Sequence, residues 1–90
     1  MGRPGGAEKM ADVIFDDVCK IIVEQFNLMK EKITPDTSLA DDLHLDSLDL
    51  VEYVVLVEHE FDINIPDDDM PALQTVQDVV NYIEEIMVNG

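Results

Sequence analysis

Basic side chains are scarce in this sequence, and the Lys and Arg residues are confined to its N-terminal part. Five Lys and Arg stand against 21 Asp and Glu among 90 residues, which gives a formal net charge of −16. No Lys or Arg follows Lys32, although most of the acidic residues do. A field of this sign repels nucleic-acid phosphates and anionic lipid headgroups, so we expect neither nucleic acid nor a membrane as a partner. We expect partner proteins that present basic surfaces.

Cysteine is nearly absent, and long apolar runs are missing. The single thiol of Cys19 excludes an internal disulfide and a multi-cysteine zinc site, and its place near an apolar arc predicts a buried packing residue. No run approaches the roughly 20 apolar residues of a membrane helix, and no signal peptide is recognisable. Hydrophobic residues still make up 47% of the chain, enough for one small, soluble, folded domain.

The first ten residues differ from the rest in composition. They hold glycines, a proline and two of the five basic residues, with no apolar periodicity. We expect a flexible tail, or the remnant of an expression tag, over 1–10 and the folded domain over 11–90.

Three stretches show the periodicity of amphipathic helices. The first covers 11–27, the second runs from Asp46 or Ser47 to 61, and the third begins near Thr75. Pro66 and the three aspartates after it favour a short helical turn, which Pro71 should keep short. We therefore predict an all-α fold, a small bundle of three main helices plus one short helix.

The same periodicity assigns core positions. The last helix should bury one stripe, consisting of Val76, Val79, Val80, Ile83, Ile86 and Met87. In the long loop over 28–45, Leu39, Leu43 and Leu45 are spaced as anchors to the core. The segment 62–65 alternates like a strand but has no partner strand.

The second helix carries two apolar faces. The first should face the core and consists of Leu50, Tyr53, Val54, Val57 and Phe61. Leu48, Val51 and Val55 lie on the opposite side, among acidic residues. Incidental surface residues and a docking face for a partner protein explain this second stripe equally well from geometry alone.

Ser47 stands at the start of this helix, where unpaired backbone N–H groups and the helix dipole favour a phosphate. A serine in that place is more often a structural N-cap, so its position alone does not assign a role.

The run Asp46-Ser47-Leu48-Asp49-Leu50-Val51-Glu52, followed by Glu58, Glu60-Phe61-Asp62 and Ile65-Pro66-Asp67, resembles an acyl carrier protein of type II fatty acid synthesis. The resemblance covers nearly all of 11–88. It implies that Ser47 carries 4′-phosphopantetheine, obtained from coenzyme A, and that acyl intermediates travel on this arm as thioesters. It implies a carrier and not an enzyme, with no catalytic residues and no metal.

The resemblance also implies partners. A phosphopantetheinyl transferase and fatty acid synthesis enzymes with basic docking patches should bind the predicted partner-binding residues, which are Asp46, Leu48, Asp49, Val51, Glu52, Val55, Glu58 and His59. We expect a monomer in the bacterial cytoplasm, ahead of a mature plastid or mitochondrial protein.

Five positions depart from the family pattern. His44 and Leu45 replace the usual glycine and small residue, which predicts a stiffer loop before the helix. His59 replaces a usual acid, Val55 replaces a frequent methionine, and Pro71 interrupts the short third helix.

Other functions fit the sequence less well. The sequence lacks the Gly-x-Ser-x-Gly elbow of a serine hydrolase. His59 lies about 18 Å along the same helix from Ser47, at 1.5 Å per residue. An EF-hand starting at Asp62 lacks the glycine at its sixth position and the glutamate at its twelfth. Two alternatives stay open. One is a carrier for polyketide, peptide or other specialised groups, and the other is a non-covalent acidic adaptor for basic helices.

Overall fold

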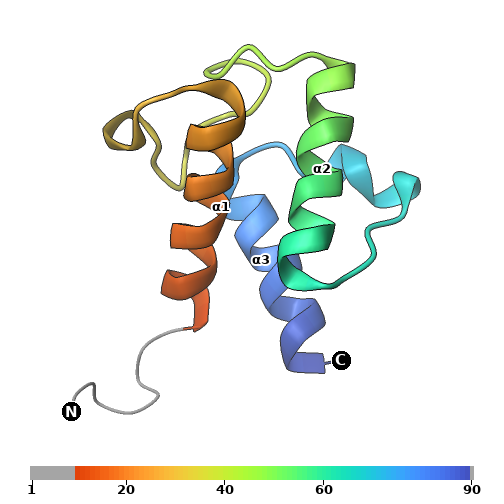
Figure 1. Ribbon diagram of the computed structural model, residues 1–90. Coiled ribbons are helices and arrows are strands. Elements are labelled where there is room, and N and C mark those ends of the chain that lie inside the picture. The colour runs from red at the N-terminus through yellow and green to blue at the C-terminus, as the bar shows by residue number, and fades with distance from the viewer. Residues whose placement is uncertain (1–9, 90) are drawn as a thin grey trace, which may run out of the picture.

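The computed structural model describes residues 10–89, which form three α-helices and two short 3₁₀ helices (Figure 1). The elements are α1 (Met10–Phe26), η2 (Lys30–Lys32), α2 (Ser47–Phe61), η3 (Asp67–Ala72) and α3 (Val76–Asn89). Helices α1 and α2 run antiparallel, and α3 packs against α1 (Figure 1). Within this range there is no strand, only an isolated bridge between Ser38 and Thr75. The predicted all-α bundle is confirmed. The tail expected over 1–10 lies outside the described residues except at Met10, where α1 begins.

One aliphatic core joins the three helices. The buried side chains of α1 are Ile14, Val18, Cys19 and Ile22, those of α2 are Tyr53, Val54 and Val57, and those of α3 are Val76, Val79, Val80 and Ile83. Each set repeats at three or four residues, so one stripe of each helix faces the core. Cys19 is a packing residue as predicted, and burial raises the pKa of its thiol.

The end of α3 departs from the prediction. Met87 is 44% exposed, so its predicted burial is wrong, and Ile86 is only half-buried. The last turn of α3 extends past the end of α2 in Figure 1. Helical periodicity places a residue on a face but does not say how far the neighbouring helix extends.

The long loop between α1 and α2 is anchored to the core and to α3. Leu39 and Leu45 are buried and Leu43 is half-buried, which confirms the predicted anchors. The backbone N–H of Leu39 donates to the carbonyl of Gln74 at 2.9 Å, and that of Val76 donates to Thr37 at 3.0 Å. These bonds fix the loop beside the start of α3, and with it the chain that enters α2.

Caps define the ends of the helices. Thr75 caps α3 as predicted, because its hydroxyl accepts from the N–H of Asp78 at 3.1 Å. The Asp78 carboxylate accepts from the N–H of Thr75, also at 3.1 Å. Helix α2 ends at Phe61, and its C-cap Asp62 takes the left-handed conformation with φ of 55°. The chain that follows is not a strand, and Ile65 from this segment is buried.

Candidate functional site

Asp46, and not Ser47, caps helix α2. The Asp46 carboxylate accepts from the backbone N–H of Asp49 at 2.9 Å, and the Asp49 carboxylate accepts from the N–H of Asp46 at 3.3 Å. This reciprocal pair is a capping box. Ser47 becomes the first residue of the helix, with an exposed side chain. Its hydroxyl is therefore not the structural N-cap that a serine in this place would usually be.

The turn before α2 depends on His44. This residue has φ of 58°, in the left-handed region where glycine is preferred. A side chain with a Cβ costs roughly 1 kcal/mol there. The turn directs Leu45 into the core, where its N–H donates to the carbonyl of Leu39 at 3.1 Å. His44 thus adopts a backbone conformation that glycine prefers, and Asp46, two residues later, caps α2.

The second apolar stripe of α2 lies on the surface, as predicted. Leu48 is 75% exposed, Val51 47% and Val55 43%. Val51 and Val55 line a shallow hollow of about 290 Å³ together with Gln25, Glu52 and Leu56. These apolar side chains therefore share one concave surface with an acidic residue, which favours the docking interpretation over incidental exposure.

Three of the predicted partner-binding acids also hold local structure. Asp46 and Asp49 form the capping box. Glu58 is half-buried, and its carboxylate accepts from the N–H of Ile65 at 2.6 Å, which ties the end of α2 to the following loop. Glu52 and His59 are exposed. Among the predicted partner-binding acids, Glu52 is therefore the one that accepts no backbone hydrogen bond from the residues described.

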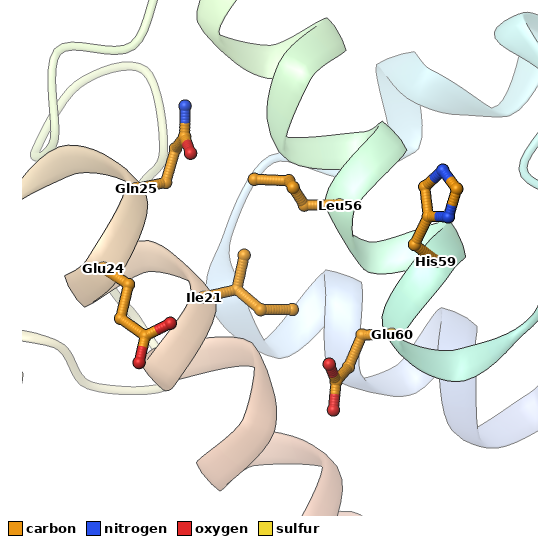
Figure 2. A pocket seen from close by; sticks show the side chains of 6 residues that line it. All are labelled: Ile21, Glu24, Gln25, Leu56, His59 and Glu60. Atoms are coloured by element: carbon orange, nitrogen blue, oxygen red, sulfur yellow. The ribbon is translucent and has the colours of Figure 1, made fainter.

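Helix α1 contributes side chains that the sequence did not assign to the site. The amide of Gln25 donates to the carboxylate of Glu52 at 3.3 Å and so links α1 to α2. A second hollow of about 320 Å³ lies between the two helices and is lined by Ile21, Glu24, Gln25, Leu56, His59 and Glu60 (Figure 2). The only sequence signal for it was the amphipathic pattern of α1, which does not reveal the neighbouring helix.

A third hollow lies beside the first turn of α2. It measures about 220 Å³ and is bounded by Leu50 of α2, by the loop around Leu39, and by Met70 and Leu73 in and after η3. Leu50 follows Ser47 by less than one helical turn, so this hollow opens near the start of α2.

The described part of the chain has neither a cluster of metal ligands nor a membrane-spanning helix. No group of three or more His, Cys, Asp and Glu residues between 10 and 89 is arranged to hold a metal ion. Over the same residues, no helix has the length and apolar character needed to cross a membrane.

Comparison with known proteins agrees with this geometry. The chain matches the family described as a phosphopantetheine attachment site over residues 16–83. It is 44% identical over 73 residues to the acyl carrier protein of Sulfurovum sp., covering 81% of this chain and 97% of the relative. It is 49% identical over 72 residues to the acyl carrier protein of Bdellovibrio bacteriovorus, covering 80% of this chain and 92% of the relative. For the acyl carrier protein of Campylobacter lari the identity is 45% over 73 residues, with 81% and 95% covered.

The bundle and the family match define a domain that holds 4′-phosphopantetheine covalently. The chain belongs to the acyl carrier protein family, as its sequence motifs predicted. Its role is to carry acyl groups, and the chemistry on those groups is performed by the enzymes that it meets.

Proposed function

We propose that Ser47 is the residue that bears 4′-phosphopantetheine, and that the chain carries the acyl intermediates of fatty acid synthesis on it as thioesters. The observation that carries this proposal is the capping of α2 by Asp46, which leaves the exposed Ser47 hydroxyl available at the helix start. In the loading reaction the hydroxyl oxygen attacks a phosphate of coenzyme A and loses its proton. The phosphopantetheine passes to Ser47, and the nucleotide part of coenzyme A leaves.

The start of α2 suits the phosphodiester that results. The N–H groups of Asp49 and Leu50 already donate to Asp46, whereas those of Ser47 and Leu48 have no partner within the helix. These two N–H groups and the helix dipole attract the phosphate. The carboxylates of Asp46 and Asp49 would repel a phosphodiester on Ser47, which would favour an arm extended away from these two side chains.

The hollow beside Leu50 is the place where we expect a loaded chain to rest between enzymes. Its walls include Leu39, Met70 and Leu73, and Leu50 in its lining follows Ser47 by three residues. An apolar acyl chain gains free energy by leaving water for such walls, and this also hides the thioester from hydrolysis.

The partners of this proposal are a phosphopantetheinyl transferase and fatty acid synthesis enzymes with basic patches. We use the term docking face for the exposed side of α2 formed by Leu48, Val51, Glu52 and Val55, together with Asp46, Asp49, Glu58 and His59. Its apolar residues are framed by acids, so charge attraction guides the encounter and apolar contacts hold the complex. Brief contacts of this type suit a carrier that visits several enzymes.

The proposed location is the bacterial cytoplasm, where the chain acts as a monomer. The relatives reported above come from bacteria. A net charge of −16 makes two copies repel each other, which supports the monomer. Light scattering coupled to size exclusion at physiological salt measures the mass directly, and a dimer would contradict this part of the proposal.

Intact mass spectrometry tests the attachment. The purified chain, incubated with coenzyme A and a bacterial phosphopantetheinyl transferase, should gain the mass of one phosphopantetheine group. Ser47→Ala should gain none while remaining helical by circular dichroism. Normal modification of that variant would overturn the assignment, and no modification of the parent would favour a non-covalent adaptor.

The attached cargo identifies the pathway. The chain isolated from its own cells should carry simple fatty acyl groups, visible as additional mass on the phosphopantetheine. Polyketide intermediates or aminoacyl groups would instead assign the chain to a specialised pathway.

A further inference from the structure

A groove with an apolar floor lies between α1 and α2. Figure 2 shows Ile21 of α1 and Leu56 of α2 pointing toward each other across the space between the helices. Both side chains are half-buried. The carboxylates of Glu24 and Glu60 point to one side of them in this view, and Glu24 and Glu60 are exposed. The hollow thus combines an apolar base with acids contributed by both helices.

This hollow continues into the docking face. Gln25 and Leu56 line both it and the shallower hollow that holds Val51 and Val55. The hydrogen bond of 3.3 Å from Gln25 to Glu52 joins the helices where the two hollows meet. We call the combined surface the α1–α2 groove. Leu56 follows Ser47 by nine residues, or about 14 Å of helix, so an enzyme of ordinary size that covers Ser47 also reaches the groove.

The acids of the groove differ from the acids of α2 that accept backbone hydrogen bonds. Asp46 and Asp49 have carboxylates engaged in the capping box, and Glu58 accepts from Ile65. Between residues 10 and 89 the one ion pair joins Lys30 to Asp16, so neither Glu24 nor Glu60 has a cationic partner there. Two like charges beside an apolar floor are best complemented by a positive group on an apolar stem.

We propose that the α1–α2 groove receives a long basic side chain of the enzyme that loads Ser47, and that helix α1 therefore takes part in recognition. The methylene stem of the incoming Lys or Arg lies on Ile21 and Leu56, and its cation lies between Glu24 and Glu60. An apolar neighbour on the same segment of the enzyme contacts Val51 and Val55. This inference rests on the proposed function, because it takes the phosphopantetheinyl transferase as the partner.

The test compares two double variants with the same change of charge. Glu24→Gln with Glu60→Gln removes the acids of the groove, whereas Glu31→Gln with Glu85→Gln removes two exposed acids elsewhere, in η2 and α3. All four positions are exposed, so both double variants should fold, which melting by circular dichroism checks. The dissociation constant of each apo chain for a bacterial phosphopantetheinyl transferase is measured at low salt, together with kcat/KM for loading by coenzyme A.

The groove variant should bind about tenfold more weakly than the parent, with kcat/KM falling by a similar factor, whereas the control should change by about twofold or less. Equal losses in the two double variants would overturn the groove, because general electrostatic attraction would then account for both. The proposed function would survive that result, since the parent would still be loaded. If the parent itself acquires no arm, the proposed function fails and this inference fails with it.

Discussion

Asp46 and Asp49 accept hydrogen bonds from each other's backbone N–H groups, at 2.9 and 3.3 Å. Because of this reciprocal contact Ser47, the first residue of the helix, has no capping role. A carrier benefits when the residue that caps the helix and the residue that bears the arm are different residues. The attachment hydroxyl can be converted to a phosphodiester without removing the bond that starts the helix.

The first prediction compares the two residues. Asp46→Ala should lower the free energy of unfolding by about 1 kcal/mol, because the cap is lost. Ser47→Ala should cost clearly less, since its side chain is exposed and is not the cap. Urea denaturation of the apo variants measures both values. Equal losses would mean that the serine shares the capping role.

The second prediction concerns the buried hydroxyl of Tyr53. This side chain is 1% exposed, and no described residue offers its oxygen a hydrogen bond. Tyr53→Phe should therefore stabilise the bundle by about 1 kcal/mol, because a buried polar group without a partner is removed. Tyr82→Phe is the matched control and should destabilise, since the Tyr82 hydroxyl donates to Asp69 at 2.6 Å. A loss of stability in Tyr53→Phe would show that its hydroxyl has a partner in solution.

The third prediction concerns alkaline pH. The pKa of Tyr82 is raised from 10.0 to about 12, mainly by burial and secondly by the hydrogen bond to Asp69. Burial also raises the pKa of Tyr53. Each folded tyrosine holds its proton more tightly than the unfolded one. The stability that this contributes is therefore complete below about pH 10 and is lost as the pH rises through the folded pKa.

Urea denaturation between pH 8 and pH 11 tests this sign. The free energy of unfolding should fall above about pH 10, and it should fall less steeply in Tyr53→Phe than in the parent. A stability that rises over this range would contradict the assignment. Cys19 should add to this loss of stability at alkaline pH, because burial raises the pKa of its thiol above the usual 9.0.

The fourth prediction concerns ionic strength. Charges of one sign dominate after Lys32, and residues 10–89 contain only the Lys30 to Asp16 ion pair, so salt has little attraction to weaken and much repulsion to screen. Sodium chloride or millimolar divalent cations should raise the melting temperature, which differential scanning calorimetry measures. A melting temperature independent of salt would count against self-repulsion as the main unfavourable electrostatic effect.

The helices and both faces of α2 could be predicted from the sequence because they depend on local periodicity. Tyr53 and Val57 repeat at helical spacing toward the core, and Val51 and Val55 repeat toward solvent. The capping residue could not be chosen, because Asp and Ser both cap helices well. The choice depends on the direction in which the chain enters α2, which the left-handed conformation of His44 sets.

The α1 side of the groove was also beyond sequence reasoning. Gln25 and Glu52 meet although they lie 27 residues apart. Their contact depends on how α1 and α2 cross, and side-chain packing across the whole core determines that crossing. The exposure of Met87 has a similar origin, since it depends on how far the helices packed around α3 extend.

The fifth prediction separates charge from apolar contact on the docking face. Glu52 is exposed, on the side of α2 opposite the core, so Glu52→Lys should leave the bundle folded even though the hydrogen bond from Gln25 is lost. If a basic patch on the enzyme guides the encounter, this variant should associate several-fold more slowly with a phosphopantetheinyl transferase. The effect should be largest at low salt, where the attraction is least screened.

Val51→Ala is the complementary change. Val51 is 47% exposed in the unbound chain, and its remaining surface loses contact with water only in the complex. Its truncation should therefore speed dissociation and leave the association rate nearly unchanged, because apolar contacts act after the encounter. Stopped-flow or surface plasmon resonance measures the two rates, with Glu85→Lys on α3 as the charge-matched control. If Glu52→Lys associates at low salt as fast as the parent, Glu52 takes no part in guiding the encounter, and the acids of α2 serve solubility instead.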